Sequence, residues 1–101
     1  MAYYLQLVTL TEEGRRSFEE NPEWIMGINK DIEFMGAKIL TQYALLGQFD
    51  FVNIIEAPSD EVAAKVAIKL SSRGTIQPIT LAAIPLENLI DTLKKQPHTP
   101  W

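Results

Sequence analysis

Three amide side chains on strand-like segments are the strongest candidates for binding a ligand or taking part in a reaction. Gln6, Gln42 and Asn53 fall, with Tyr4 and Thr80, on one face of the sheet predicted below. A buried amide needs a partner, because an unpaired one costs on the order of 1–3 kcal/mol. The five side chains could satisfy one another across an interface, or line a pocket and orient a small organic ligand, with catalysis as a third role. They are the candidate ligand-binding residues.

Two carboxylates near the predicted hairpin form a second candidate set. Asp50 could accept hydrogen bonds from backbone N–H groups and lock the hairpin, or act as a general base. Glu56 lies further along the same strand, about 20 Å away at roughly 3.3 Å per residue. That separation excludes the carboxylate pair of a glycosidase.

Composition narrows the chemistry further. The 101 residues include no cysteine and one histidine, His98, which lies in a proline-bounded tail. Disulfides and thiolate nucleophiles are therefore excluded, and a histidine metal site or catalytic triad within one chain is not expected. We expect no metal and no cofactor, haem included.

Charge and hydropathy bear on partners and location. Nine Lys and Arg against 13 Asp and Glu give a net charge of −4 without a basic run, so nucleic-acid binding is disfavoured. No apolar run reaches the roughly 18 residues of a membrane span, and the N-terminus lacks a signal-peptide pattern. The sequence predicts a single soluble, cytoplasmic domain, residues 1–95, and a tail, residues 96–101.

The elements that position the candidate residues centre on Gly47-Gln48. This pair suits a two-residue type II′ hairpin turn, because glycine tolerates a positive φ. The turn sets a register in which Gln42 faces Asn53 and Leu40 faces Ile55. The full pattern predicts strands at 2–10, 38–46, 49–57 and 75–84, and helices at 12–20, 22–35, 60–73 and from Pro85 onward.

This order is typical of the α+β, ferredoxin-like βαββαβ fold, with an antiparallel four-stranded sheet ordered 4-1-3-2, helices on one face and here an added C-terminal helix. We assign to the helix side Leu5, Leu7, Val52, Ile54, Ile79 and Leu81. The opposite face then holds Tyr4, Gln6, Val8, Leu40, Gln42, Phe51, Asn53, Ile55, Ile76 and Thr80. Because so apolar a patch usually marks an interface, we expect a second copy of the sheet, the last helix folded back within the chain, or both, to cover it.

The hairpin residues Gly47, Phe49 and Asp50, followed by Val52, Ile54 and Glu56-Ala57-Pro58, resemble the GYD domain family, which is named for a glycine, tyrosine and aspartate signature. The likeness runs from the first strand and its Thr11-x-x-Gly14 start through the fourth strand, and covers the C-terminal helix less. The family's tyrosine is Phe49 here, so chemistry that needs a phenol at that position is absent. We interpret Gly47, Phe49 and Asp50 as a structural motif.

The resemblance implies a fold similar to that of dimeric α/β-barrel proteins. That group contains cofactor-free monooxygenases, isomerases, haem proteins and ligand-sensing modules, so several functions stay open. Our first expectation is a homo-oligomeric binding or interaction module whose cleft at the subunit interface accepts a small apolar metabolite. The alternatives are a cofactor-independent monooxygenase or isomerase, and a purely structural assembly subunit. The lack of an evident acid and base pair argues against an enzyme.

Overall fold

The computed structural model describes residues 1–95 of the 101. The elements are β1 (Ala2–Leu10), α1 (Glu12–Glu20), α2 (Trp24–Phe34), β2 (Lys38–Ala44), β3 (Phe51–Ala57), α3 (Asp60–Ser72), β4 (Ile76–Ala83) and α4 (Leu86–Lys95). The predicted tail, with His98, lies outside the described residues. None of the helices within them is long and apolar enough to cross a membrane.

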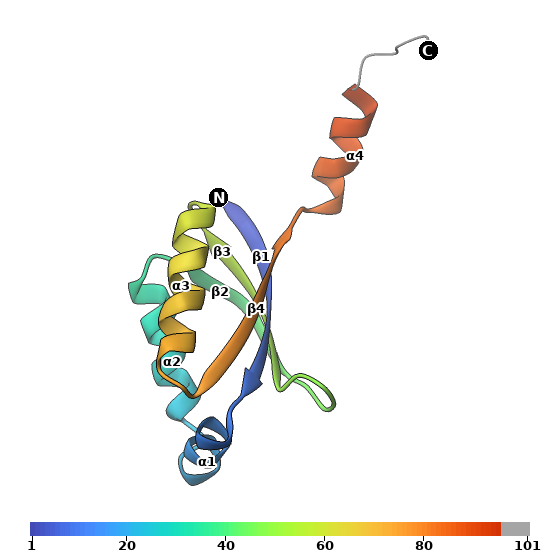
Figure 1. Cartoon of the computed structure of the whole chain (residues 1–101). Coiled ribbons are helices and arrows are strands. Elements are labelled where there is room, and N and C mark those ends of the chain that lie inside the picture. Colours follow the sequence, from blue (N-terminus) through green and yellow to red (C-terminus); the bar gives the residue numbers. More distant parts are fainter. Residues whose placement is uncertain (96–101) are drawn as a thin grey trace.

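The strands form one antiparallel sheet in the order β2-β3-β1-β4. This is the predicted order 4-1-3-2 read from the other edge, so the ferredoxin-like α+β fold is confirmed. Figure 1 shows α2 and α3 on the same side of the sheet, and α4 projecting beyond the end of β4, away from the other elements. One face of the sheet is therefore covered by helices, and the other is left without a helical layer.

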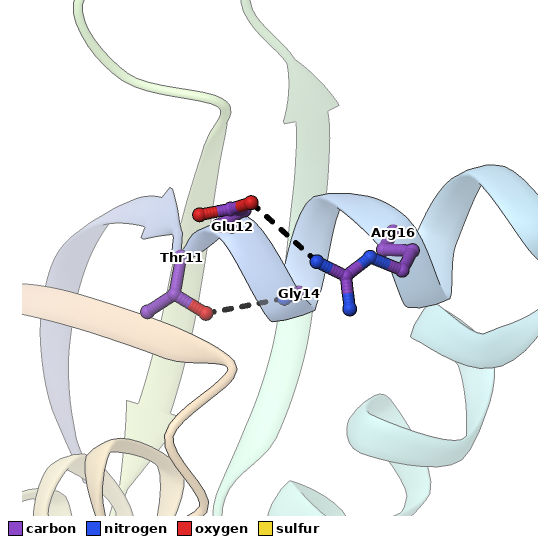
Figure 2. Close-up of polar contacts among 4 residues, drawn as sticks. All are labelled: Thr11, Glu12, Gly14 and Arg16. Carbon is purple, nitrogen blue, oxygen red and sulfur yellow. Dashed lines mark hydrogen bonds and ion pairs between the residues drawn. The ribbon is translucent and has the colours of Figure 1, made fainter.

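The junction between β1 and α1 is built from a cap and a close backbone approach. Thr11 is the N-cap of α1, and its Oγ1 accepts a hydrogen bond from the Gly14 N–H at 3.1 Å (Figure 2). The same hydroxyl donates to the Gly74 carbonyl at 2.7 Å. A side chain at Gly14 would not fit, since its Cβ would lie 2.0 Å from the Thr75 carbonyl oxygen. The start of α1 is thus fastened to the turn between α3 and β4.

The core lies between the helices and the face of the sheet that carries the amides. Its central side chains come from two helices and the sheet. Ile32 from α2, Val66 and Leu70 from α3, and Ile55 from β3 are all at most 1% exposed. The second helix starts two residues later than predicted, at Trp24, without a side-chain cap. Ser59 caps α3, accepting from the Val62 N–H at 3.2 Å.

The predicted assignment of the two sheet faces was wrong. Strands β1 and β3 bury every second residue, and the buried set is the one predicted to face away from the helices: Tyr4, Gln6, Val8, Phe51, Asn53 and Ile55. The other face, called the open face below, is lined by Leu5, Leu7, Tyr43, Val52, Ile54, Ile79 and Leu81. Both faces are largely apolar, so strand alternation alone cannot tell which one the helices cover.

The turn of the β2–β3 hairpin is wider than the predicted two-residue turn. The last cross-strand bond runs from the Leu45 N–H to the Asp50 carbonyl at 2.8 Å. The residues between them form the loop, in which Gly47 has a φ of +134°. Asp50 is also bonded to β1, since its N–H donates to the Val8 carbonyl at 2.8 Å.

The hairpin register is confirmed near the turn and shifts at one position. Gln42 lies opposite Asn53, as predicted. A bulge falls between Ile39 and Thr41, so Ile39, and not Leu40, pairs with Ile55. The bulge leaves Leu40 42% exposed, whereas Ile39 packs against the core.

Candidate interaction surfaces and the buried amide row

The sheet register places four of the five predicted ligand-binding residues in one line. Gln42, Asn53, Gln6 and Thr80 lie opposite one another on β2, β3, β1 and β4. Gln42 Nε2 donates to Asn53 Oδ1 at 2.8 Å, and Asn53 Nδ2 donates to Gln6 Oε1 at 2.9 Å. Gln6 Nε2 completes the chain to Thr80 Oγ1 at 3.5 Å. We call this line the amide row.

A fifth member of the amide row, Asn29, was not predicted. It comes from α2, and its side-chain amide exchanges two hydrogen bonds with that of Gln42, at 2.8 and 3.1 Å. The signal was present in the sequence, since Asn29 lies four residues after Ile25 and therefore on the buried side of the helix. A polar residue on an apolar helix stripe points to a buried polar partner.

The amide row is enclosed. Within residues 1–95 no buried side-chain nitrogen or oxygen lacks a hydrogen-bond partner. The cavity beside the row measures about 10 Å³, which is room for about one water molecule. The row is a satisfied core network in this structure, and a ligand-binding role for these residues stays a prediction.

Tyr4, the fifth predicted residue, lies apart from the row. Its hydroxyl donates a hydrogen bond to the Asp60 carboxylate at the start of α3. This bond, with burial as the next cause, raises the pKa of Tyr4 to about 12. The contact joins the beginning of β1 to the start of α3.

The motif residue Asp50 bonds the end of β1. Its Oδ2 accepts a hydrogen bond from the Leu10 N–H at 2.7 Å, while Arg15 donates to the Leu10 carbonyl at 2.7 Å. Both polar groups of the Leu10 peptide are therefore held by side chains, one from the hairpin and one from α1. The role of Arg15 could not be read from the sequence, because it depends on how α1 is placed against β1.

An open groove lies beside this motif, between α1 and the hairpin. It has a volume of about 330 Å³ and is lined by Leu10, Arg15, Phe18, Glu19, Ala44, Leu45, Asp50 and Phe51. Its two central charged groups, Arg15 and Asp50, already bond the backbone of Leu10. The groove is thus large enough for a small ligand, but Arg15 and Asp50 in its lining are already used in hydrogen bonds that hold the fold together.

The open face is the largest apolar surface that the sheet leaves uncovered. One line across the strands holds Tyr43, Val52, Leu7 and Ile79, and the next holds Ile54, Leu5 and Leu81. On the edge strand β4, Ile79 and Leu81 are 48% and 49% exposed. Side chains of this kind pack against another protein layer in most folds.

Helix α4 forms a second apolar surface of the same kind. Leu86, Leu89, Ile90 and Leu93 recur at helical spacing and make one stripe, here called the α4 stripe. All four are at least 41% exposed, and no residue of the helix is buried. In Figure 1 the helix stands clear of the sheet. The helix therefore does not fold back over the open face of its own chain.

A family model described as GYD domain matches residues 4–93. The chain belongs to the GYD domain family. The match continues through most of α4, further than the likeness in the strands predicted. In this GYD domain Asp50 of the hairpin is the residue that bonds Leu10.

A curated relative of this GYD domain comes from Thermus thermophilus. It is 40% identical over 95 residues, which are 93% of this chain and 100% of the relative. That protein is named glutamine synthetase and cystathionine beta-lyase binding protein. No solved structure gave a significant match to the chain.

Proposed function

We propose that this GYD domain is a protein-interaction module that binds partner enzymes. The full-length relative is named for binding two enzymes, and the two chains match over nearly the whole length, α4 included. We take glutamine synthetase and cystathionine beta-lyase as the first partners to test. The proposal assigns the domain a binding role and no reaction of its own.

The observation that carries the proposal is the open face. A sheet face lined by aliphatic side chains on β1, β3 and β4 lies without a covering layer, and Tyr43 at its β2 edge is 63% exposed. Leaving such a face in water forfeits about 25 cal/mol for each Å² of apolar surface that a partner would cover. The α4 stripe adds a second surface with the same property.

We also propose that the module is homo-oligomeric. A flat apolar sheet face is well suited to a two-fold interface, because the same surface can meet itself in a closed pair. A metabolite in a cleft between subunits has less support, since the amide row lies on the opposite, helix-covered face.

The test of the proposed function is a binding measurement with the two enzymes taken from the same organism as the chain. The immobilised domain is expected to bind at least one of them with a micromolar or lower Kd by biolayer interferometry. Leu81→Glu, on the open face, should weaken binding at least about tenfold, because an unpaired carboxylate would be buried.

The matched control is Ile68→Glu on α3, where the side chain is 67% exposed on the helix side. It introduces the same charge at a site with similar exposure and should leave the Kd unchanged within about twofold. Wild-type protein that binds neither enzyme would refute the proposed function. An equal loss in the two variants would refute the assignment of the open face.

A further inference from the structure

The α4 helix needs a partner to be stable. It has ten residues, fewer than the roughly 12–15 at which isolated helices become even marginally stable in water. In proteins most helical stability comes from packing an apolar face, and none of the other residues described between 1 and 95 buries the α4 stripe. We therefore expect the surface that completes α4 to come from another molecule.

The connection to β4 directs α4 away from its own sheet. Only Ile84 and Pro85 separate the strand from the helix. Pro85 fixes its own φ, and its carbonyl already accepts the Asn88 N–H at 2.9 Å, so the helix starts at once. Figure 1 shows α4 continuing outward past the end of β4. A two-residue connection leaves little chain with which to reverse over the open face.

The open face has the size and chemistry that α4 requires. A helix of ten residues is about 15 Å long. Four strands spaced about 4.8 Å apart span about 15 Å between the outer two. Both surfaces are aliphatic, and each chain carries one of each, so the numbers of helices and faces are equal in any assembly of identical copies.

We propose that α4 of one copy lies on the open face of a second copy, which returns its own α4 in a closed two-fold exchange. The exchange pairs two stripes with two faces and closes on itself, so it does not extend into a longer assembly. A partner enzyme that binds the open face would therefore compete with α4 for it. It rests on the proposed function in one respect, that the open face is a protein–protein contact. It adds which element covers that face and from which molecule it comes.

Disulfide trapping tests the exchange directly, because the chain contains no cysteine and any disulfide must be the engineered one. Leu5, Ile54 and Leu81 lie opposite one another on β1, β3 and β4, so a helix crossing the face must pass near at least one of them. Each is changed to cysteine in turn, together with Leu89→Cys in the α4 stripe. Mild oxidation of the full chain should give a covalent dimer on non-reducing gels for at least one pair.

The control pair combines Leu89→Cys with Ile68→Cys on the outer side of α3, which should give no more dimer than Leu89→Cys alone. Mass spectrometry of the linked peptides must show residue 89 joined to the open face. An intrachain disulfide would show that α4 folds back in its own chain and would overturn the proposal. A dimer in light scattering without any cross-link between residue 89 and the face would overturn the exchange alone.

Affinity gives a second readout that needs no cysteine. Leu89→Ala should raise the Kd of the dimer roughly tenfold or more, because it removes most of an aliphatic side chain from the interface. Leu46→Ala, in the hairpin loop where the side chain is fully exposed, should leave the Kd unchanged. A dimer unaffected by Leu89→Ala would overturn the exchange. Binding to the two enzymes is measured separately, so loss of enzyme binding with an intact exchange would refute only the proposed function.

Discussion

The face of the sheet that the helices bury contains the polar amides, and the face that they leave uncovered is the more apolar one. The face under the helices contains the amide row, with Gln6 at 0% and Asn53 at 3% exposure. The open face has aliphatic side chains at the centres of β1, β3 and β4, yet no helix lies over it. A polar row can therefore be buried when each of its members has a hydrogen-bond partner. An apolar face can be exposed in the single chain and become buried only when another molecule binds it.

The amides can be buried because each one exchanges its hydrogen bonds to water for hydrogen bonds within the protein. An amide that exchanges its water partners for protein partners loses little free energy, whereas an amide left unpaired loses about 1–3 kcal/mol. Asn29 on α2 supplies the missing partner for Gln42, and the row then runs unbroken across the sheet. The covered face is thus specified by complementary polar groups as well as by apolar contact.

The sharpest test of the comparison uses two adjacent isoleucines on β3 that point to opposite faces. Ile55 is fully buried among the helices, and Ile54 is half-buried on the open face. Ile55→Ala should lower the free energy of unfolding by about 2–5 kcal/mol, through lost burial and the cavity that remains. Ile54→Ala should cost about 1 kcal/mol or less at concentrations where the chain is monomeric.

Urea denaturation followed by circular dichroism measures both changes. At high concentration Ile54→Ala is expected to weaken self-association, which Ile55→Ala should not do directly. Equal losses of unfolding free energy for the two variants would contradict the assignment of the faces, since the same chemical deletion would then be felt equally on both sides.

The amide row offers the next largest effect. Asn53→Leu keeps the branched shape of the side chain but leaves Gln6 Oε1 without its donor, while Gln42 keeps its bonds to Asn29. We expect a loss of about 1–3 kcal/mol in unfolding free energy from the unpaired oxygen. The double variant Asn53→Leu/Gln6→Leu should lose less than the sum of the two single variants, because no buried amide is then left alone. Strict additivity in urea denaturation would show that the row is not coupled.

Much of the fold could be predicted because its signals are local. Thr11 and Ser59 cap helices, Pro85 starts one, and the strand order follows from the order of elements. The hairpin register near Gln42 and Asn53 followed from the position of Gly47 alone. These features depend on residues close in sequence, so a single chain reveals them.

What could not be predicted depends on contacts between distant segments. The choice of covered face required Asn29 to be placed against Gln42, and the sequence offered two faces of similar hydropathy. The wide turn is accompanied by the bonds of Asp50 to β1, and the outward course of α4 reflects a short connection. Four of the five candidate residues were therefore grouped correctly in the amide row, Tyr4 being the exception, but the whole group was assigned to the wrong side of the sheet.

The smallest expected effect concerns the edge of the covered face, where Tyr4 meets α3. Its hydrogen bond to Asp60, followed by burial, raises the pKa of Tyr4 from 10.0 to about 12. Because the pKa of the folded state exceeds that of the unfolded state, this group contributes stability that is fully present below pH 10 and is lost as the pH rises through 12. The urea midpoint should therefore fall across this window by more in the wild type than in Tyr4→Phe.

The matched control for this pH dependence is Tyr43→Phe on the open face, where the side chain is 63% exposed. This variant should keep the full fall of the wild type, since the removed hydroxyl is not the one bonded to Asp60. A Tyr4→Phe variant with the same fall as the wild type would mean that other groups set the alkaline limit. A reduced fall in Tyr4→Phe alone would identify the bond between β1 and α3 as the part of the covered face that is sensitive to pH.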